Sequence, residues 1–460
     1  MSLINSEIAN EVIGYGISLG ADFVDLFVEK TQSQNLVFKS SKVEDSQSGV
    51  QFGIGIRLIS GHQSLYAYTN STEKEELLRI TKLLAAQIKS NPKDLVQLDF
   101  TNLNYPKIPV LGDKDVDAKH KIETFKNIDR ALRSDHKTAQ VILNFTQKKQ
   151  LIEIFNSEGL YATEERPYIR LYHQLVMKDG EYQTIAGVGP GAIGGWDFIE
   201  GLNKEEMAEN LLKQANTVLY AKSAPAGNMP VIIDNGFGGV IFHEACGHLL
   251  ETTSVEKKAS VFWDKMGEKI AHSAVTAVDD GTVDGAWGSL SIDDEGMPTQ
   301  KTTLIENGIL KRFISDRMGE IKTGHKRTGS GRRQNYKFAP ASRMRNTYIA
   351  AGKNSFEEMI GSVSHGIYAK KMGGGSVDPS TGQFNFAVQE AYIIKDGKIM
   401  EPVKGATLIG TGPEIMSRIS MVGSNLSLEA GMCGSVSGSI PTTVGQPAIK
   451  VDEILVGGEV

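Results

Sequence analysis

The sequence is poor in cysteine, in aromatic residues and in long apolar runs. Its two cysteines, Cys246 and Cys433, cannot build a disulfide framework, and we expect a reducing, cytoplasmic setting. No segment approaches the ~20 apolar residues that a membrane span needs. Residues Met1–Glu7 have no basic stretch followed by an apolar core, so we expect no secretory signal.

Neither the net charge nor the sequence motifs indicate a protein that binds nucleic acid or nucleotides. The net charge of −6 argues against general affinity for nucleic acid or anionic membrane. The sequence has no phosphate loop and no serine-hydrolase elbow, and its GxG elements lack the strand–turn–helix setting of a dinucleotide site. A chain of 460 residues is too long for one core, so two or three domains are expected.

Helical and strand periodicities alternate along the first half. They predict helices over Ser6–Leu19, Lys74–Lys89, Ala118–Arg133 and Lys204–Tyr220. They predict strands over Asp22–Val28, Gln34–Lys39, Gly49–Ile59 and His62–Tyr68, and strands from Ala139 to Met177 broken at Asn156–Gly159. Loops are predicted for Asn91–Asp113, Gly187–Trp196 and Lys371–Gln383.

Small residues and two prolines over Ala221–Pro230 predict a domain boundary. We therefore expect an α+β chain of two domains, residues 1–222 and 223–460. The first would be an α/β domain with a mixed or antiparallel sheet. The second would be rich in strands and would contain a helix that runs from about Asn235 to Leu250 and carries the chemistry described next.

Residues 243–248 read H-E-A-C-G-H, which places two imidazoles and a carboxylate within six positions. Imidazoles bind Zn²⁺, and Glu244 is placed to take a proton from water. In a regular helix, five residues turn the chain by about 140°, so His243 and His248 would point apart. They can converge only if the helix is distorted, and we predict a π-turn or kink between Glu244 and His248, eased by Gly247.

A catalytic zinc site usually takes a third protein ligand and leaves the fourth position open. Cys433, between glycines in Ala430–Gly434, is the best candidate, and Cys246 competes with it. A core role is the alternative, since His243 can fill a core and free cysteines are commonly buried small hydrophobes. Periodicity alone leaves this choice open.

Two further segments carry charged residues that suit binding. The acidic run Ile292–Gly296 could orient a metal ligand, or it could be a solvated turn. Arg332 and Arg333, in a flexible Gly-Ser-Gly-Arg-Arg run, could grip carboxylates or a peptide C-terminus, or lie in a surface loop. We predict substrate contacts from Arg332, Arg333 and Gly434.

Several blocks, in a specific order, resemble the TldD/PmbA family of metalloproteases, and its TldD branch in particular. The resemblance spans nearly the whole chain. The blocks are Gly239–His248, Ile292–Gly296 with Leu304–Leu310, Thr328–Arg333 with Arg343–Tyr348, Gly410–Glu414, and Cys433-Gly434 with Gly445–Pro447. Residues 249–253, Leu-Leu-Glu-Thr-Thr, depart from the family, which tends to have a glycine soon after the histidine and an acidic residue near Thr253.

The resemblance implies zinc held by His243, His248 and Cys433, with Glu244 as the base. It also implies a dimer, either a homodimer or a heterodimer with a PmbA-like paralogue, that acts on unfolded or flexible peptides bound in extended form. A zinc peptidase is therefore expected. The alternatives are a non-catalytic, zinc-stabilised subunit that binds peptides, and a zinc hydrolase acting on small amides.

Overall fold

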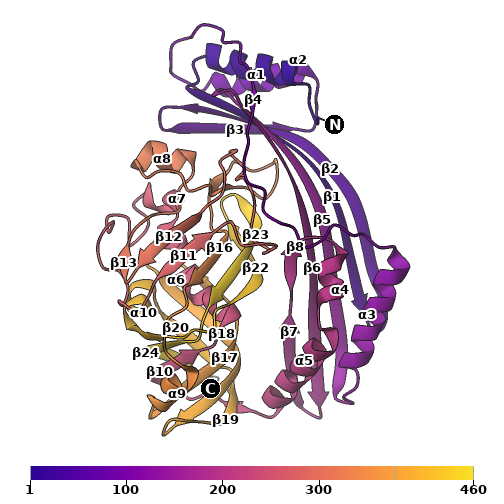
Figure 1. The fold of residues 1–460 in the computed structure, drawn as a ribbon, viewed down its shortest axis with the longest axis vertical. Coiled ribbons are helices and arrows are strands. Elements are labelled where there is room, and N and C mark those ends of the chain that lie inside the picture. Colours follow the sequence, from indigo (N-terminus) through magenta and orange to yellow (C-terminus); the bar gives the residue numbers. More distant parts are fainter. Residues whose placement is uncertain (1, 379, 459–460) are drawn as a thin grey trace.

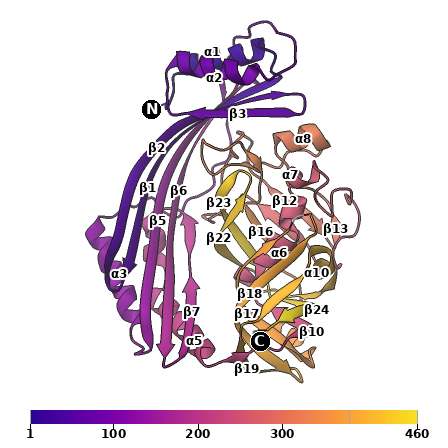
Figure 2. The ribbon, with the colours of Figure 1, turned by 180° about the vertical axis from the view of Figure 1, so that it is seen from behind.

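The structure, a computed structural model, describes residues 2–378 and 380–458. The chain is α+β, as the sequence predicts. A tall, curved sheet stands beside a rounder C-terminal half that is built mainly of strands (Figures 1 and 2). Within the described ranges, no helix is long and apolar enough to cross a membrane.

The curved sheet is built around the long antiparallel strands β1, β2, β5 and β6 from the first half of the chain, and the short strand β4 pairs with β6 in parallel. Its main order is β3-β2-β1-β5-β6-β4, and β7 and β8 also pair with β6. The strands are β1 (Phe23–Lys39), β2 (Lys42–Ser60), β3 (Gln63–Thr69), β4 (Thr101–Asn102), β5 (Thr138–Asn156), β6 (Leu160–Asp179), β7 (Tyr182–Val188) and β8 (Gly191–Ile193).

The sequence predicts shorter strands than the structure has. The segments predicted over Asp22–Val28 and Gln34–Lys39 are one strand, β1, because polar residues between them stay in the ladder. Glu29 in that stretch is buried and accepts hydrogen bonds from Gln150 Nε2 at 3.0 Å and from the Tyr336 backbone N–H at 2.7 Å. Partners on neighbouring segments make a polar residue compatible with a buried strand.

Helices cover both ends of the curved sheet. Those from the beginning of the chain pack on its upper end, and the later ones pack lower down (Figure 1). Asn5, Asp117 and Asn203 accept hydrogen bonds from backbone N–H groups in the first turns of three of them, which fixes their start points. The helices are α1 (Ser6–Ser18), α2 (Lys74–Ala85), α3 (Ala118–Leu132), α4 (Trp196–Gly201) and α5 (Lys204–Leu219).

The C-terminal half contains two further large sheets. The second sheet has the order β17-β10-β24-β20-β18-β19-β9, with β21 paired to β24. Its strands are β9 (Lys222–Ser223), β10 (Gly227–Ile233), β17 (His365–Val377), β18 (Gln383–Lys395), β19 (Lys398–Lys404), β20 (Thr407–Thr411), β21 (Ile419–Val422) and β24 (Ile449–Gly457). The predicted loop Lys371–Gln383 is thus largely wrong, because β17 and β18 extend into it and pair.

The third sheet has the order β13-β12-β11-β16-β23-β22, so β22 lies at its end. Its strands are β11 (Ala277–Asp280), β12 (Lys301–Glu306), β13 (Ile309–Leu310), β16 (Asn346–Ile349), β22 (Ser427–Ser435) and β23 (Gly438–Gln446), and a separate pair is formed by β14 (Gly331–Arg332) and β15 (Ala341–Ser342). The helices of this half are α6 (Val240–Ala245), α7 (Thr252–Val255), α8 (Arg317–Thr323), α9 (Phe356–Gly361) and α10 (Gly412–Arg418).

Helix α6 lies inside the C-terminal half. It packs against β17 and β18 of the second sheet and against β16 and β23 of the third. Its residues Val240, Ile241 and Phe242 belong to the main hydrophobic core. Burial on both sides fixes the position of this short helix, which brings its polar residues to a defined place between the sheets.

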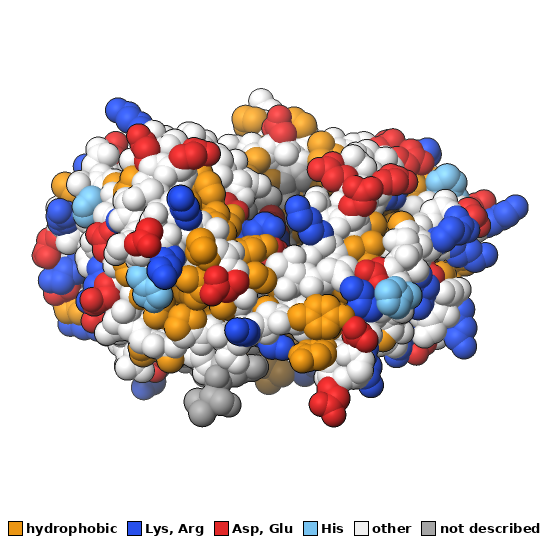
Figure 3. Space-filling model, turned by 90° about the horizontal axis from the view of Figure 1, so that it is seen from below, with side chains coloured by type: hydrophobic (Ala, Val, Ile, Leu, Met, Phe, Trp, Pro, Cys, Tyr) orange, Lys and Arg blue, Asp and Glu red, His pale blue; other side chains and the backbone are white. Residues whose placement is uncertain are grey.

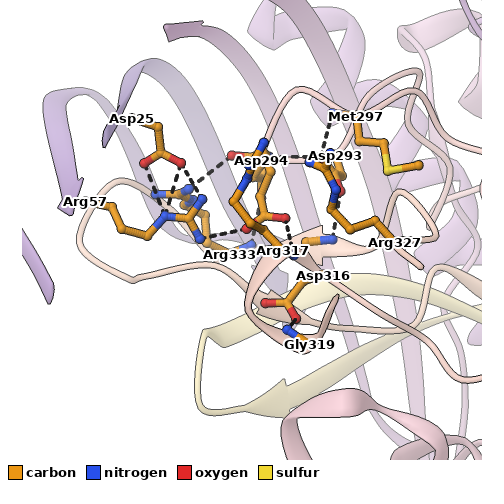
Figure 4. Close-up of polar contacts among 12 residues, drawn as sticks. Asp25, Arg57, Asp293, Asp294, Met297, Asp316, Arg317, Gly319, Arg327 and Arg333 are labelled. Carbon is orange, nitrogen blue, oxygen red and sulfur yellow. Dashed lines mark hydrogen bonds and ion pairs between the residues drawn. The ribbon is translucent and has the colours of Figure 1, made fainter. Parts of the chain in front are cut away.

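A set of ion pairs, buried except for Glu158, joins the curved sheet to the C-terminal half; Figure 4 labels Asp25, Arg57, Asp294 and Arg317 of this set. Arg57 is bonded to Asp25 on the neighbouring strand and to Glu295, 2.6 Å away, from the other half. Arg166 contacts Asp294 at 2.6 Å, and Arg317 contacts Glu158 at 2.7 Å. We call this set the interface cluster; its members are Asp25, Arg57, Glu158, Arg166, Asp294, Glu295 and Arg317.

The chain passes from α5 to the strands of the second sheet within residues 219–227. This is the segment of small residues and prolines that predicts the boundary. We propose that the division into domains, 1–222 and 223–460, lies here, since the main hydrophobic core of the C-terminal half begins with Ala224.

Candidate metal centre

The H-E-A-C-G-H segment is not one continuous helix. Helix α6 ends at Ala245, Cys246 leaves helical geometry with φ −136° and ψ −46°, and a 3₁₀ turn spans Gly247–Leu250. The predicted kink is confirmed, in the form of a break and a 3₁₀ turn. Gly247 is needed for space, because a Cβ there would lie 2.2 Å from Met344 Sδ.

The kink turns both imidazoles toward one cysteine. His243 Nε2 lies 3.2 Å from Cys433 Sγ, and His248 Nε2 lies 3.4 Å from the same sulfur. A ligand atom of each of the three residues lies within 4.8 Å of the others, and all three residues are buried. We call these three residues the metal group. Cys433 reaches it from β22, far along the chain, so pairing of β22 with β23 sets its position.

Each imidazole is oriented by a second contact on its other nitrogen. His243 Nδ1 lies 3.1 Å from Thr347 Oγ1, and His248 Nδ1 lies 3.0 Å from Glu251 Oε2. A carboxylate that accepts from Nδ1–H fixes the tautomer and leaves the Nε2 lone pair free to bind a metal. Both Nε2 atoms point to the sulfur, so the two rings present converging donors.

A buried arginine holds the backbone that carries the cysteine. Arg343 Nη2 donates to the Cys433 carbonyl at 2.6 Å, and Nη1 donates to Ser437 Oγ and the Gly438 carbonyl. Its Nε lies 3.9 Å from Glu251 Oε1. Arg343 therefore links the strand of the thiol to the carboxylate that orients His248.

The electrostatics favour a thiolate in the metal group. Burial alone would raise the pKa of the Cys433 thiol, but the adjacent His243 and His248 imidazoles bring that pKa well below its usual value. Burial disfavours a charged His248, yet the Glu251 and Cys433 side chains raise the pKa of His248 well above its usual value. Two imidazoles and a thiolate are the soft and borderline donors that suit Zn²⁺, so the residues fit this ion.

Glu244 is the most accessible residue of the segment. Its side chain is 20% exposed, and its Oε2 lies 3.7 Å from His248 Nε2. It is thus beside the metal group without belonging to it. Cys246 is fully buried in the main core, burial raises the pKa of its thiol, and it does not join the metal group.

The other expected site residues lie elsewhere. The guanidinium of Arg332 donates to the carbonyls of Met344 and Pro441, and that of Arg333 donates to Tyr66 and Asp294, so both are engaged inside the protein. Gly434 follows Cys433 on β22 and is exposed. Contacts of these three residues with a substrate stay a prediction.

The acidic run Ile292–Gly296 neither orients a metal ligand nor forms a solvated turn, the two roles considered from the sequence. Its carboxylates are buried, so it is not a solvated turn, and they bind backbone N–H groups and arginines rather than a metal ligand. The interpretation as a support for the metal is wrong. The run instead anchors the C-terminal half to the curved sheet.

Sequence reasoning missed three residues that position the site: Glu251, Thr347 and Arg343. Glu251 follows His248 by three residues, a spacing that places it within reach of the ring, and this signal was available in the sequence. Thr347 and Arg343 come from a distant segment, and no local pattern distinguishes them from other polar residues near a strand.

Models of a known protein family match most of this chain. Three family models match: domain 1 of the PmbA/TldA metallopeptidases over residues 24–87, the central domain over 112–219 and the C-terminal domain over 226–458. The chain belongs to the PmbA/TldA metallopeptidase family. The family predicted from the sequence is thereby confirmed, and the metal group and Glu244 lie within the C-terminal domain of these metallopeptidases.

Related sequences and solved structures match this chain along nearly its full length. The chain is 36% identical to a metalloprotease TldD homologue of Haemophilus influenzae, over 95% of this chain and 93% of the relative. A TldD homologue of Buchnera aphidicola subsp. Acyrthosiphon pisum is 34% identical, with the same coverage. The crystal structure of TldE from Thermococcus kodakarensis, 21% identical, superposes with a TM-score of 0.76 over 98% of this chain and 100% of that one, which shows the shared fold.

Proposed function

We propose that the protein is a zinc-dependent metallopeptidase. The observation that carries this proposal is the metal group with a partly exposed carboxylate, Glu244, beside it. Among the described residues, the metal group has three potential ligands and no fourth. A structural zinc site would be closed by a fourth protein ligand, so the arrangement favours catalysis over the alternative of a zinc-stabilised binding subunit.

His243, His248 and Cys433 would hold the ion. A zinc ion held there would polarise the scissile carbonyl and make water more acidic, with a pKa near ~7. Glu251 and Thr347 keep the two imidazoles in the required orientation. Glu244 takes a proton from the attacking water on its carboxylate and passes it to the nitrogen of the leaving amine. The C–N bond breaks, the acyl carbon gains a hydroxyl group and the nitrogen gains a proton.

The substrate is a peptide in extended form. Cys433 is on β22, which ends the third sheet, and an extended peptide can add to such an edge by backbone hydrogen bonds with little demand on sequence. A cavity of about 460 Å³, lined by Leu428–Ala430 of the same strand and by no residue of the metal group, offers room for further residues of a peptide beyond the bond that is cut. A cleft between two helices, with no free strand edge beside the metal group, would contradict this mode of binding.

We further propose that the chain works in the cytoplasm as a homodimer or as a heterodimer with a PmbA-like paralogue. Family membership supports the dimer, and two buried free cysteines fit a reducing compartment. The partners would be peptides or unfolded proteins, with no role for nucleic acid or membrane.

The test is zinc content per chain, measured by elemental mass spectrometry on the parent and on Cys433→Ala and Glu244→Gln. We expect about one zinc ion per parent chain, loss from Cys433→Ala and retention in Glu244→Gln. Cleavage of an unfolded peptide should fall by about 10²- to 10⁴-fold in Glu244→Gln. Zinc-loaded parent protein that cleaves no peptide would contradict the proposal, as would full activity in Glu244→Gln.

A further inference from the structure

The cavity beside β22 is formed by both halves of the molecule. The curved sheet contributes Arg170, Tyr172 and the Gly187–Gly191 segment, and the C-terminal half contributes residues of β17 and β22. A second cavity of about 360 Å³ shares Gly187, Val188 and Lys371 with it and extends toward α5. Seen from below, the surface is hollowed between the two halves, with lysine and arginine side chains beside the hollow (Figure 3).

The lining mixes apolar residues, glycines and a few polar or charged groups. The apolar residues are Val188, Pro190, Phe198, Leu202, Phe237, Met372, Leu428 and Ala430. Lys371 is paired with Glu429, at 2.8 Å. That leaves Arg170 as the charged residue of the lining without a carboxylate within ion-pair distance among the described residues. Such a cavity suits a peptide and offers one unpaired positive charge.

Arg170 differs from the arginines of the interface cluster. Arg57, Arg166 and Arg317 each pair with a carboxylate. Among the described residues, Arg170 donates to carbonyls alone, from Nε to Gly189 and from Nη2 to Ala430, both at 3.1 Å, and its guanidinium carbon lies 5.7 Å from the centre of the Trp287 ring. Burial lowers its pKa, which reflects a partly desolvated cation with no acidic partner. A guanidinium without a carboxylate in a cavity is a group that an anion can satisfy.

The glycines around Arg170 fix its place. A Cβ on Gly189 would lie 3.0 Å from Arg170 Nη2 and 2.5 Å from Tyr172 Cδ2, and a Cβ on Gly191 would lie 3.1 Å from Arg170 Cγ. A side chain at Gly189 would clash with the Tyr172 ring and crowd the guanidinium, so glycine there leaves room for both. The glycine-rich stretch that looks like a plain loop in the sequence is therefore the wall that holds Arg170 at the cavity.

We infer that Arg170 forms a substrate subsite that binds a carboxylate of the peptide, about three residues from the bond that is cut. This inference rests on the proposed function and deepens it. Ala430, which accepts from Arg170, precedes Cys433 by three residues on β22. At ~3.3 Å per residue in an extended strand, these positions are ~10 Å apart, and a peptide lying along β22 advances at the same rate.

The carboxylate has two sources with the same chemistry. It can be the side chain of an acidic residue, or the C-terminal carboxylate of the peptide. An acidic side chain makes the cut follow that residue wherever it stands in the peptide. A terminal carboxylate makes the enzyme release a C-terminal fragment of fixed length, about three residues long.

The test uses labelled heptapeptides of alanine and leucine that carry an internal Glu or Gln and end in a carboxylate or an amide. Binding is measured by fluorescence anisotropy in the Glu244→Gln background, where cleavage is slow enough for the peptides to stay intact during the measurement. We expect the neutral peptide to bind about 10- to 100-fold more weakly than at least one anionic form. In Arg170→Gln with Glu244→Gln, this ratio should fall to about one.

Arg130→Gln is the matched control, because it removes an exposed guanidinium on α3, outside the cavity. It should keep the parent ratio. The ratio between peptides is independent of how much protein is folded, so partial loss of structure in Arg170→Gln cannot imitate the result. Mass spectrometry of the products made by the parent enzyme then distinguishes the two sources of the carboxylate.

Two outcomes separate this subsite from the proposed function. If the parent cleaves peptides but binds anionic and neutral forms equally, or if Arg170→Gln keeps the preference, the subsite is overturned and the peptidase stands. If zinc-loaded parent protein neither binds nor cleaves any of the peptides, both the proposed function and the subsite fall.

Discussion

The interface cluster, apart from Glu158, and the metal group are both buried and both polar, yet their polar groups are arranged in opposite ways. In the interface cluster, guanidiniums and carboxylates meet as pairs, with Arg57 lying between Asp25 and Glu295. In the metal group, three potential ligand atoms, from His243, His248 and Cys433, converge within 4.8 Å of one another. Paired charges neutralise each other and hold two parts of the fold together, whereas converging electron-pair donors form a binding site for a metal ion.

The supports of the two regions differ in the same way. Arg57 is held by charges from both halves, so its contacts join two bodies of the molecule (Figure 4). Glu251 and Arg343 act on one small site, where they orient His248 and the backbone of Cys433. A change in the interface cluster should therefore alter stability, and a change around the metal group should alter affinity for the ion.

The largest effect is expected for Arg57→Met. The variant leaves Asp25 and Glu295 buried without their cation, which costs about 3–5 kcal/mol when one partner of a buried pair is removed. The measurement is urea unfolding followed by circular dichroism. Arg79→Met, which removes an exposed arginine on α2, is the control and should unfold like the parent. Equal destabilisation by both variants would show that the ion pairs of Arg57 contribute no more to stability than the exposed ion pair of Arg79.

A smaller effect, which depends on pH, is expected for Asp316→Asn. Burial, followed by repulsion from Glu295, raises the pKa of Asp316 to about 7. The folded state thus keeps a proton that the unfolded chain, with a pKa of ~3.9, has lost. The contribution of Asp316 to stability is therefore present in acid and is lost as the pH rises from about 4 to about 7.

Asparagine removes this titration and retains the Oδ1 that accepts from the Gly319 N–H at the start of α8. Relative to the parent, Asp316→Asn should gain stability between pH 4 and pH 8, on the order of a few kcal/mol. Urea midpoints of both proteins across this range measure the gain. Asp264→Asn, at an exposed position, is the control. The prediction would be contradicted if the urea midpoints of the parent and of Asp316→Asn changed in parallel across the pH range.

The smallest effect is expected for Glu251→Gln. Loss of the carboxylate on His248 Nδ1 should weaken zinc binding by about 10- to 100-fold and change stability little in the presence of zinc. Competition with a chromogenic chelator measures the affinity. Glu268→Gln, which removes an exposed carboxylate, should bind zinc like the parent. Unchanged affinity in Glu251→Gln would mean that this contact does not tune the metal group.

The helices were predictable because their apolar spacing and their end signals are local. The expected Ser6–Leu19, Lys74–Lys89 and Ala118–Arg133 agree closely with α1, α2 and α3. Strand lengths were harder to predict, since Glu29 and its neighbours remain in β1 only because distant partners satisfy them. Lys371–Gln383 has the composition of a loop, but pairing of β17 with β18 makes most of it a hairpin.

The sequence alone determined the donor types and the need for a distorted helix. A separation of five residues from His243 to His248 cannot bring the two rings together on a regular helix, so the kink follows from spacing and geometry. The tertiary structure decided which cysteine meets them, because Cys433 lies 190 residues from His243 and only the placement of β22 beside α6 closes that distance.

The same division holds for the arginines of this chain. Their number and positions are given by the sequence, but their partners are not. Folding pairs Arg57 with two carboxylates, places the Arg332 guanidinium against carbonyls and, within the part of the chain that the structure describes, leaves Arg170 beside a cavity without a carboxylate partner. Charge pairing depends on distances between groups that are remote in the chain, and only the packing of the curved sheet against the C-terminal half sets those distances.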